Sequence, residues 1–252
     1  MNRELEGRVA IVTGAAQNIG RAIAVALGSA GASVAINAKT SADLADETAR
    51  AVRSAGGKAF VHLADISNPE EGAGLIAAAV REFGGLDILI NNAAIRRETP
   101  FAELGWTEWR EVVSVILDGA YICAKAALQH LEKSRSASIV NIGGLSAHSG
   151  APNRAHVVAA KAGLVGLTRA LAHDLSPAGI TVNCVVPGLI DIVRGGSSAP
   201  TAPPAHHKSH KTLVRRQGTP MEVAAMVRFL CGPSARYITG QTLHVNGGAF
   251  LP

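Results

Sequence analysis

Apolar residues in this chain come in short continuous runs, and stretches with helical periodicity separate the runs. A run that is apolar at every position is typical of a strand buried on both of its faces. Strands that alternate with helical stretches of about 10–25 residues predict repeated βαβ units and a parallel sheet. We expect strands at residues 9–12, 34–36, 59–63, 88–90, 138–142, 180–185 and 242–245.

The helical stretches lie between these strands, and no connection is long enough to separate two domains. The pattern predicts helices at about 19–30, 42–55, 70–83, 107–132, 153–175 and 221–231. We therefore predict one α/β domain over residues 1–252, a single-domain Rossmann fold with a doubly wound parallel sheet of about seven strands. A stretch rich in glycine, serine and proline interrupts the pattern, and we expect a mobile substrate loop at about 190–217.

Composition excludes several classes of protein. The chain has 48% hydrophobic and 17% charged residues, which is too apolar for intrinsic disorder. Three cysteines are too few for a disulfide scaffold, and their odd number in apolar segments indicates reduced thiols in a cytoplasm. No apolar run is long enough for a membrane span, and the polar N-terminus is unlike a signal peptide. The formal charge of +5 is spread along the chain, so we expect no nucleic-acid partner.

The first predicted strand leads directly into a turn of small residues and then into a helix. Gly14 opens this turn and Gly20 closes it, with Gln17, Asn18 and Ile19 between them. Such a turn lets the backbone approach a pyrophosphate, and the following helix N-terminus supplies free N–H groups and a partial positive charge. Because a strand precedes the glycines and a helix follows them, the sequence predicts a dinucleotide site.

The spacing Gly14-x3-Asn18-x-Gly20 resembles the nucleotide turn of the short-chain dehydrogenase/reductase family. The resemblance covers nearly the whole chain and includes members like the 3-oxoacyl-acyl-carrier-protein reductases. It continues through Asp65-Ile66, Asn91-Asn92-Ala93-Ala94, Ala159-Ala160-Lys161-Ala162-Gly163, Pro187-Gly188 and Val245-Asn246-Gly247-Gly248. It implies an enzyme that transfers hydride between NAD(P)(H) and a carbonyl or an alcohol.

The same resemblance implies further cofactor contacts. It places Asp65 and Ile66 against the adenine, Asn91 and Ala93 on the adenosine side, and Pro187, Gly188 and Ile190 at the nicotinamide carboxamide. It also gives Lys161 the role of binding the nicotinamide ribose.

Two positions depart from the family's nucleotide site. Asn18 replaces the middle glycine of the turn, and asparagine tolerates a positive φ better than other non-glycine residues. After the second predicted strand, Asn37 is followed by Ala38 and Lys39, where an acid would bind the ribose hydroxyls of NAD. Because Lys39 would instead attract a 2′-phosphate, we expect NADP(H) to be preferred over NAD(H).

The family's catalytic positions hold residues that cannot perform its chemistry. Family members use a Tyr as general acid, a Lys four residues later, a Ser that polarises the substrate oxygen and an Asn that holds a relay water. Lys161 is kept, but the positions of the Tyr, Ser and Asn hold Val157, Gly144 and Ile116. Because valine and isoleucine cannot donate a proton, the resemblance predicts non-standard or weak catalysis.

Nearby polar residues are candidates for the missing roles. Arg154 lies seven residues before Lys161, on the same face if the helix has begun, where it would bind an anion or polarise a carbonyl. Histidine is a common general acid or base in proteins, so His156, next to the position of the missing tyrosine, is a candidate for that role. Ser146 lies in the loop that carries the family's Ser and is a candidate to orient the substrate. We expect no metal site.

Three functions stay open on the sequence. The first is an NAD(P)(H)-dependent oxidoreductase that acts on a carbonyl or alcohol with an acid other than tyrosine. The others are a non-redox enzyme on this fold, such as an isomerase or lyase, and a catalytically inactive nucleotide-binding subunit. The expected partner is a small molecule, and Arg96 and Arg97 after the fourth strand favour an anionic one. The resemblance also implies a homotetramer or homodimer.

Overall fold

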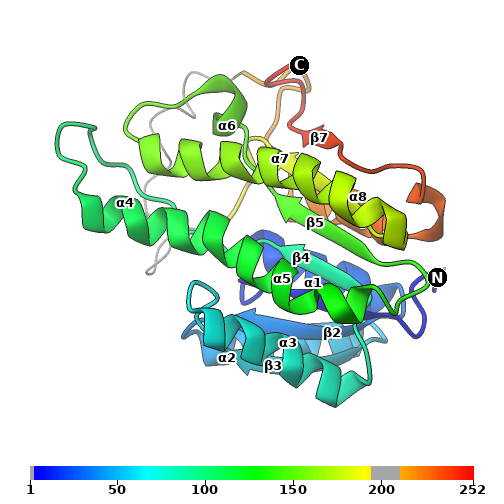
Figure 1. The fold of residues 1–252 in the computed structure, drawn as a ribbon. Coiled ribbons are helices and arrows are strands. Elements are labelled where there is room, and N and C mark those ends of the chain that lie inside the picture. The colour runs from blue at the N-terminus through cyan, green and yellow to red at the C-terminus, as the bar shows by residue number, and fades with distance from the viewer. Residues whose placement is uncertain (1–2, 194–210) are drawn as a thin grey trace.

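The computed structural model describes residues 3–193 and 211–252 and contains a parallel sheet with helices on both faces (Figure 1). Within these residues the sheet has seven strands in the order β3-β2-β1-β4-β5-β6-β7. They are β1 (Val9–Val12), β2 (Ser33–Ala38), β3 (Lys58–Leu63), β4 (Ile88–Asn91), β5 (Ser138–Ile142), β6 (Thr181–Pro187) and β7 (Thr242–Val245). The predicted Rossmann fold and its parallel sheet are therefore confirmed.

Helices connect the strands and pack on the two faces of the sheet. One face is covered by α1 (Asn18–Ser29), α2 (Ala42–Ser54) and α8 (Pro220–Cys231). The other is covered by α3 (Pro69–Phe83), α5 (Gly119–Leu131) and α7 (Ala155–Leu175). The shorter elements are α4 (Trp106–Val113), α6 (Ser146–Ser149), η2 (Ser176–Ala178) and η4 (Pro233–Ala235).

The helix predicted at 107–132 differs from the prediction. A π-helical turn, η1 (Ser114–Asp118), separates α4 from α5, and Ile116 lies within it. A π turn shifts the helix register by one residue and is often found at functional sites. The apolar periodicity runs through the turn, so the sequence pattern did not reveal it.

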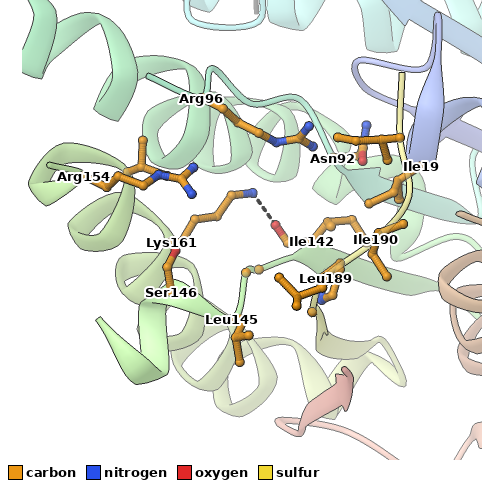
Figure 2. A pocket seen from close by; sticks show the side chains of 16 residues that line it. Ile19, Asn92, Arg96, Ile142, Leu145, Ser146, Arg154, Lys161, Leu189 and Ile190 are labelled. Carbon is orange, nitrogen blue, oxygen red and sulfur yellow. Dashed lines mark hydrogen bonds between the residues drawn. The ribbon is translucent and has the colours of Figure 1, made fainter. Parts of the chain in front are cut away.

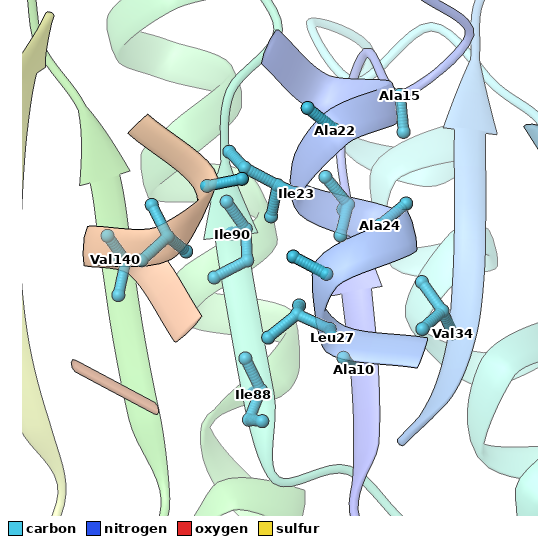
Figure 3. Packing of buried hydrophobic residues seen from close by; sticks show 14 of the residues in the cluster. Ala10, Ala15, Ala22, Ile23, Ala24, Leu27, Val34, Ile88, Ile90 and Val140 are labelled. Atoms are coloured by element: carbon cyan, nitrogen blue, oxygen red, sulfur yellow. The ribbon is translucent and has the colours of Figure 1, made fainter. Parts of the chain in front are cut away.

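Helix α1 illustrates how the sequence pattern produces the core. Ile23 and Leu27 are four residues apart and so lie on one face of the helix. They pack in one cluster with Ile88 and Ile90 of β4, and all four side chains are fully buried (Figure 3). Burying a side chain of this size stabilises the fold by about 1.5–3 kcal/mol. This packing fixes the N-terminus of α1 at the carboxyl edge of the sheet.

The strand order creates a crevice at that edge. Strand β1 has β2 on one side and β4 on the other, so the chain reverses its direction of progress across the sheet next to β1. Ligands of open α/β sheets bind outside the carboxyl ends of the strands at such a point. The segments that follow β1, β4, β5 and β6 therefore meet where the sequence predicts the site.

Helix α7 together with η2, at Ala155–Ala178, is long and apolar enough to cross a membrane by length and composition alone. The fold gives another reason for this composition. Leu164 packs in an apolar cluster with residues of α4 and η1, whereas Ala172 packs in the larger cluster under the sheet. The helix is therefore apolar because two of its faces are buried within the domain.

Candidate active site

The turn between β1 and α1 is so tight that only glycine fits at two of its positions. Gly14 has φ +60°, and a Cβ there would lie 2.8 Å from the Cα of Ala93. A Cβ on Gly20 would lie 2.4 Å from the carbonyl oxygen of Gly14. Because neither contact is tolerable, the two glycines let the turn close against the segment that follows β4.

The N-terminus of α1 has the properties of an anion site. Gln17, at its N-cap, makes no side-chain hydrogen bond to the helix, and the first turn holds no acidic residue. Helices α3 and α8 differ, because the side chains of Asn68 and Thr219 cap them. The first N–H groups of α1 therefore keep their partial positive charge for a ligand. This geometry fits the pyrophosphate of a dinucleotide.

Asn18 joins this turn to the segment that follows β6. Its φ of +54° confirms that asparagine can replace glycine in the turn. Its Nδ2 donates to the carbonyl oxygen of Val193, and the N–H of Val193 donates to its Oδ1, both at 2.9 Å. The glycine of the family could make neither bond. The replacement therefore adds a clamp between the nucleotide turn and the start of the predicted substrate loop.

We expect Asn18→Gly to open this clamp without disturbing the turn, because glycine adopts a positive φ freely. The amide hydrogen of Val193 should then exchange with solvent about tenfold faster, since a lost hydrogen bond costs about 0.5–1.5 kcal/mol. Hydrogen–deuterium exchange followed by NMR measures this rate. Asn18→Asp keeps the acceptor and loses the donor, so its rate should be intermediate. Equal rates in the wild type and the glycine variant would argue against the clamp.

The segment after β4 supports the turn through Asn92, a residue that the motifs did not single out. Its Nδ2 donates to the carbonyl oxygens of Thr13 and Gly14, each at 2.9 Å. The hydroxyl of Thr13 accepts hydrogen bonds from the N–H groups of Asn92 and Ala93. The sequence signal for this residue was the pair Asn91-Asn92 after the fourth strand. The resemblance assigned a role to Asn91 and none to Asn92.

Asn37 and Asn91, both predicted to contact the cofactor, have side chains that hold the sheet together. Asn91 donates to Asn141 at 2.8 Å, and Asn141 donates in turn to Thr168 on α7. Asn37 accepts from the N–H of Gly14 and donates to carbonyl groups at the ends of β2 and β3. The two side chains are 2% and 4% exposed, so they position the site from beneath.

The predicted adenosine end carries an ion pair. Nζ of Lys39, after β2, lies 2.6 Å from Oδ2 of Asp65, after β3. The hydrogen bond to Asp65 raises the pKa of Lys39. Burial acts to raise the pKa of Asp65, but hydrogen bonds from Lys39 and Ser67 outweigh it and lower that pKa. Both groups are therefore charged at neutral pH, whereas the side chain of Ile66 lies in the core.

A cavity of about 110 Å³ lies beyond the turn, at the ends of β4, β5 and β6 (Figure 2). Its apolar lining includes Ile19 of the glycine turn and the three residues predicted for the nicotinamide end, Pro187, Gly188 and Ile190. Its polar lining includes Asn92, Arg96, Ser146, Arg154 and Lys161. The structure therefore brings Arg154, Ser146 and Lys161 together, and none of the described lining residues is acidic.

Lys161 lies at the centre of this cavity and is 7% exposed. Its Nζ donates a hydrogen bond to the backbone carbonyl oxygen of Ile142 at the end of β5 (Figure 2). Burial, with the positive charges of Arg96 and Arg154, lowers the pKa of Lys161 to about 7. At neutral pH this amine can therefore either donate or accept a proton.

The three positions where the family carries its Asn, Ser and Tyr differ in how tightly they are packed in this chain. Ile116 and Val157 are both 2% exposed and pack in an apolar cluster with Leu164. Gly144 leaves open space, because the nearest atom to a Cβ there would be the Cγ of Lys161, at 3.9 Å. One wall of the cavity is therefore apolar, and a small space lies next to the lysine.

The structure does not bring His156 to the cavity. Its ring is fully buried, and its Nε2 lies 3.2 Å from Oε1 of Glu108. The reason is helical geometry, since successive residues point about 100° apart. Arg97 likewise turns away from its neighbour Arg96 and forms an ion pair with Glu111.

The predicted substrate loop at about 190–217 is described only at its ends. Residues 194–210 lie outside the described residues, and Ile190 forms an isolated parallel bridge with Gly218. In the two described ranges, no group of three or more His, Cys, Asp or Glu residues is arranged to hold a metal ion.

A Rossmann fold with a glycine turn, an uncapped helix N-terminus and a buried lysine at one edge has the features of a dinucleotide-binding fold. Residues 14–249 match the family model described as enoyl-(acyl carrier protein) reductase. The chain is 36% identical over 250 residues to 3-oxoacyl-(acyl-carrier-protein) reductase of Synechocystis sp., covering 98% of both chains. It is 37% identical over 252 residues to the Vibrio cholerae protein of the same name, covering 98% of this chain and 99% of that one.

A solved structure agrees with these matches. A short chain dehydrogenase from Burkholderia cenocepacia in complex with NADP is 34% identical and matches with a TM-score of 0.90. The match covers 98% of this chain and 99% of that one. The chain therefore belongs to the short-chain dehydrogenase/reductase family, whose members are NAD(P)-dependent oxidoreductases.

Proposed function

We propose that this protein is an NADP(H)-dependent oxidoreductase that interconverts a small carbonyl compound and its alcohol, with Lys161 as proton donor in place of the family's tyrosine. One observation carries the proposal. Among the described residues that line the cavity, Lys161 alone has a side chain that titrates near neutral pH. A general acid is most effective when its pKa lies near the working pH.

The chemistry requires a hydride at the carbonyl carbon and a proton at the carbonyl oxygen. A nucleotide held at the glycine turn would supply the hydride, and the ammonium group of Lys161 would supply the proton. The hydrogen bond to Ile142 holds Nζ in place during the transfer. Ser146 and Arg154, which line the same cavity, would orient and polarise the substrate oxygen. A positioned general acid contributes about 10²–10⁴ in rate.

The relatives support the class of reaction. Two of them are named as reductases of a 3-oxoacyl group, and a carbonyl is therefore the group that those proteins act on. The solved structure from Burkholderia cenocepacia holds NADP. Neither name fixes the substrate of this chain, whose lining residues include the departures Gly144 and Val157.

Single-turnover oxidation of NADPH tests the proposal. The protein, in excess over NADPH, is mixed with oxo acids, cyclic ketones and a 3-oxoacyl thioester, and the loss of NADPH absorbance is followed. We expect slow oxidation that declines as the pH rises above about 7, because protonated Lys161 is then lost. Wild-type protein that binds NADPH and oxidises it with none of these compounds would refute the proposal.

The proposed preference for NADP(H) rests on Lys39, whose charged side chain is 65% exposed at the end of β2. We expect Lys39→Asp to weaken NADPH binding by about tenfold or more, because only NADPH carries the 2′-phosphate. NADH binding should stay the same or become stronger, because an acid at this position accepts hydrogen bonds from the ribose hydroxyls. Fluorescence titration with both nucleotides measures the ratio. Lys58→Asp is the control, because Lys58 begins β3 at the edge of the sheet away from the site. It should change neither dissociation constant. Equal losses for both nucleotides would contradict this role.

A second candidate function has its own supporting observation. Where the family carries a polar Asn and Tyr, this chain has the apolar residues Ile116 and Val157, which pack in one cluster. No other polar group takes these two positions. This favours a nucleotide-binding protein without hydride transfer, either an enzyme for a non-redox reaction or an inactive subunit. Conversion of a substrate with no net change in NADPH would identify the non-redox enzyme. Copurification of an active partner would identify the inactive subunit.

We further propose that the protein works in the cytoplasm as a homodimer or homotetramer. Its three cysteines are free and buried, which suits a reducing compartment. Trp106 on α4 and Tyr121 on α5 are 74% and 56% exposed. Where such side chains belong to one contiguous apolar patch, they mark a surface that becomes buried on association. Light scattering after size-exclusion chromatography measures the mass in solution.

A further inference from the structure

Three side chains that can carry a positive charge line the cavity, and they come from two parts of the fold. Arg96 comes from the segment after β4, Arg154 immediately precedes α7, and Lys161 lies within α7. Figure 2 shows the two guanidinium groups on either side of the Lys161 amine. None of the other described residues that line the cavity carries a negative charge. The cavity therefore has a positive lining.

Burial makes these charges effective. Arg154 and Lys161 are 6% and 7% exposed. A guanidinium group stays protonated at any pH at which a protein is folded. Charges interact more strongly where water is excluded, so an anion that entered the cavity would be attracted by the two guanidinium groups and by Lys161 once it is protonated. The same fields act on Lys161, whose pKa is lowered by burial and by Arg96 and Arg154.

We propose that Arg96, Arg154 and Lys161 form a subsite for the carboxylate of a small oxo acid, and that the bound carboxylate draws a proton onto Lys161. The planar fork of an arginine matches a carboxylate, which it binds through parallel hydrogen bonds. The carbonyl group of an oxo acid lies next to the carboxylate, so it would come within reach of the protonated amine. This inference deepens the proposed function and rests on it for the reaction, but not for binding.

The proton balance follows from the groups that face Lys161. These are Arg96 from the segment after β4, Arg154 at the start of α7, and Cys184 on β6. Burial raises the pKa of Cys184 to about 11, so this thiol stays neutral. Only Lys161 changes its state when the carboxylate binds: the neutral amine takes one proton from solvent and becomes ammonium. Binding of the substrate thus produces the acid that the reduction needs.

Calorimetric titration with oxamate tests the subsite. Oxamate is a carboxylate analogue of a 2-oxo acid that is not reduced, so the measurement does not depend on turnover. At about pH 8, above the pKa of Lys161, we expect uptake of up to one proton per oxamate. At about pH 8, uptake is measured as the difference in binding enthalpy between Tris and HEPES buffers. It should vanish at about pH 5.5, where Lys161 is already protonated, and there acetate and MES serve as the buffer pair. Oxamide, the neutral analogue, should bind at least about tenfold more weakly.

Variants assign the binding to these side chains. Arg96→Gln should weaken oxamate binding by at least about tenfold, because it removes a charge-assisted hydrogen bond. Arg97→Gln is the matched control, since Arg97 is paired with Glu111 and does not line the cavity. Lys161→Met should abolish proton uptake, and Arg154→Gln should weaken binding as Arg96→Gln does.

Four results would overturn the subsite. They are equal binding of oxamate and oxamide, equal effects of Arg96→Gln and Arg97→Gln, binding without proton uptake, and a clear preference for inorganic phosphate over oxamate. Oxamate binding as expected without NADPH oxidation would keep the subsite and refute only the proposed function. NADPH oxidation without oxamate binding would do the reverse.

Discussion

Gly144→Ser combined with Val157→Tyr is expected to raise NADPH-dependent carbonyl reduction by about 10²–10⁴-fold. The two changes place hydroxyl groups at the positions where the family carries its Ser and Tyr. The tyrosine at position 157 would lie four residues, or about one helical turn, before Lys161. The serine has room, because a Cβ at Gly144 would meet nothing closer than the Cγ of Lys161, at 3.9 Å. Val157 lines the cavity, so a tyrosine there has a path toward the same space.

The electrostatics of the cavity favour such a tyrosine. The positive charges of Arg96 and Arg154, which lower the pKa of Lys161, would also lower the pKa of a phenol beside them. The phenol would then donate its proton more readily than a free tyrosine. It would relieve Lys161 of the role of acid and leave it to bind the nicotinamide ribose. Single-turnover rates with the same panel of carbonyl compounds measure the gain.

The control for this prediction is Gly144→Ser with Val157→Phe, which adds the same ring without the hydroxyl group. The phenylalanine variant should stay at or below the wild-type rate. If the tyrosine and phenylalanine variants reduce substrate equally slowly while both bind NADPH, the cavity does not position a carbonyl for reduction. That result would favour a nucleotide-binding protein without hydride transfer.

The sequence predicted the fold because the fold depends on patterns that local residues carry. Continuous apolar runs such as that of β1 predicted the strands. The tight turn from Gly14 to Gly20 predicted where along the sheet the nucleotide site lies. The helix predicted at 107–132 was incomplete, since the π turn around Ile116 leaves the apolar periodicity unchanged. Register shifts of this kind depend on packing between helices, which sequence spacing does not describe.

The candidate site was harder to predict, because side-chain direction decides which neighbour reaches the cavity. Arg96 lines it and Arg97 does not, although the two are adjacent. The same holds for Asn92 and Asn91, since Asn92 lines the cavity while the amide of Asn91 is bonded to Asn141. The lowered pKa of Lys161 was also beyond the sequence, because it arises mainly from burial and in part from Arg96, which lies on a segment far away in the sequence.

The unfolding free energy of the protein should rise with pH through the buried amine of Lys161. Its pKa is 10.5 in an exposed chain and about 7 in the folded state. Between these values the unfolded state binds a proton that the folded state does not, so raising the pH favours folding. Each pKa unit corresponds to about 1.4 kcal/mol, which gives a contribution on the order of 3 kcal/mol between about pH 7.5 and 10. Below about pH 7 the unfolding free energy no longer changes with pH through Lys161, since the amine is then protonated in both the folded and the unfolded state.

Lys161→Met isolates this contribution, because methionine fills similar space and carries no proton. Urea unfolding at several pH values measures the unfolding free energy of both proteins. Between about pH 7.5 and 10, the value for wild type should rise by about 3 kcal/mol relative to that of the variant. At about pH 7 and below, the variant should be the more stable protein, since it does not bury a charge. Lys125→Met, at an exposed position of α5, should leave the wild-type pH dependence intact. If wild type and Lys161→Met keep a constant difference from pH 7 to 10, the amine is charged in the folded state throughout. Lys161 would then act as a fixed positive charge, and another group would have to supply the proton.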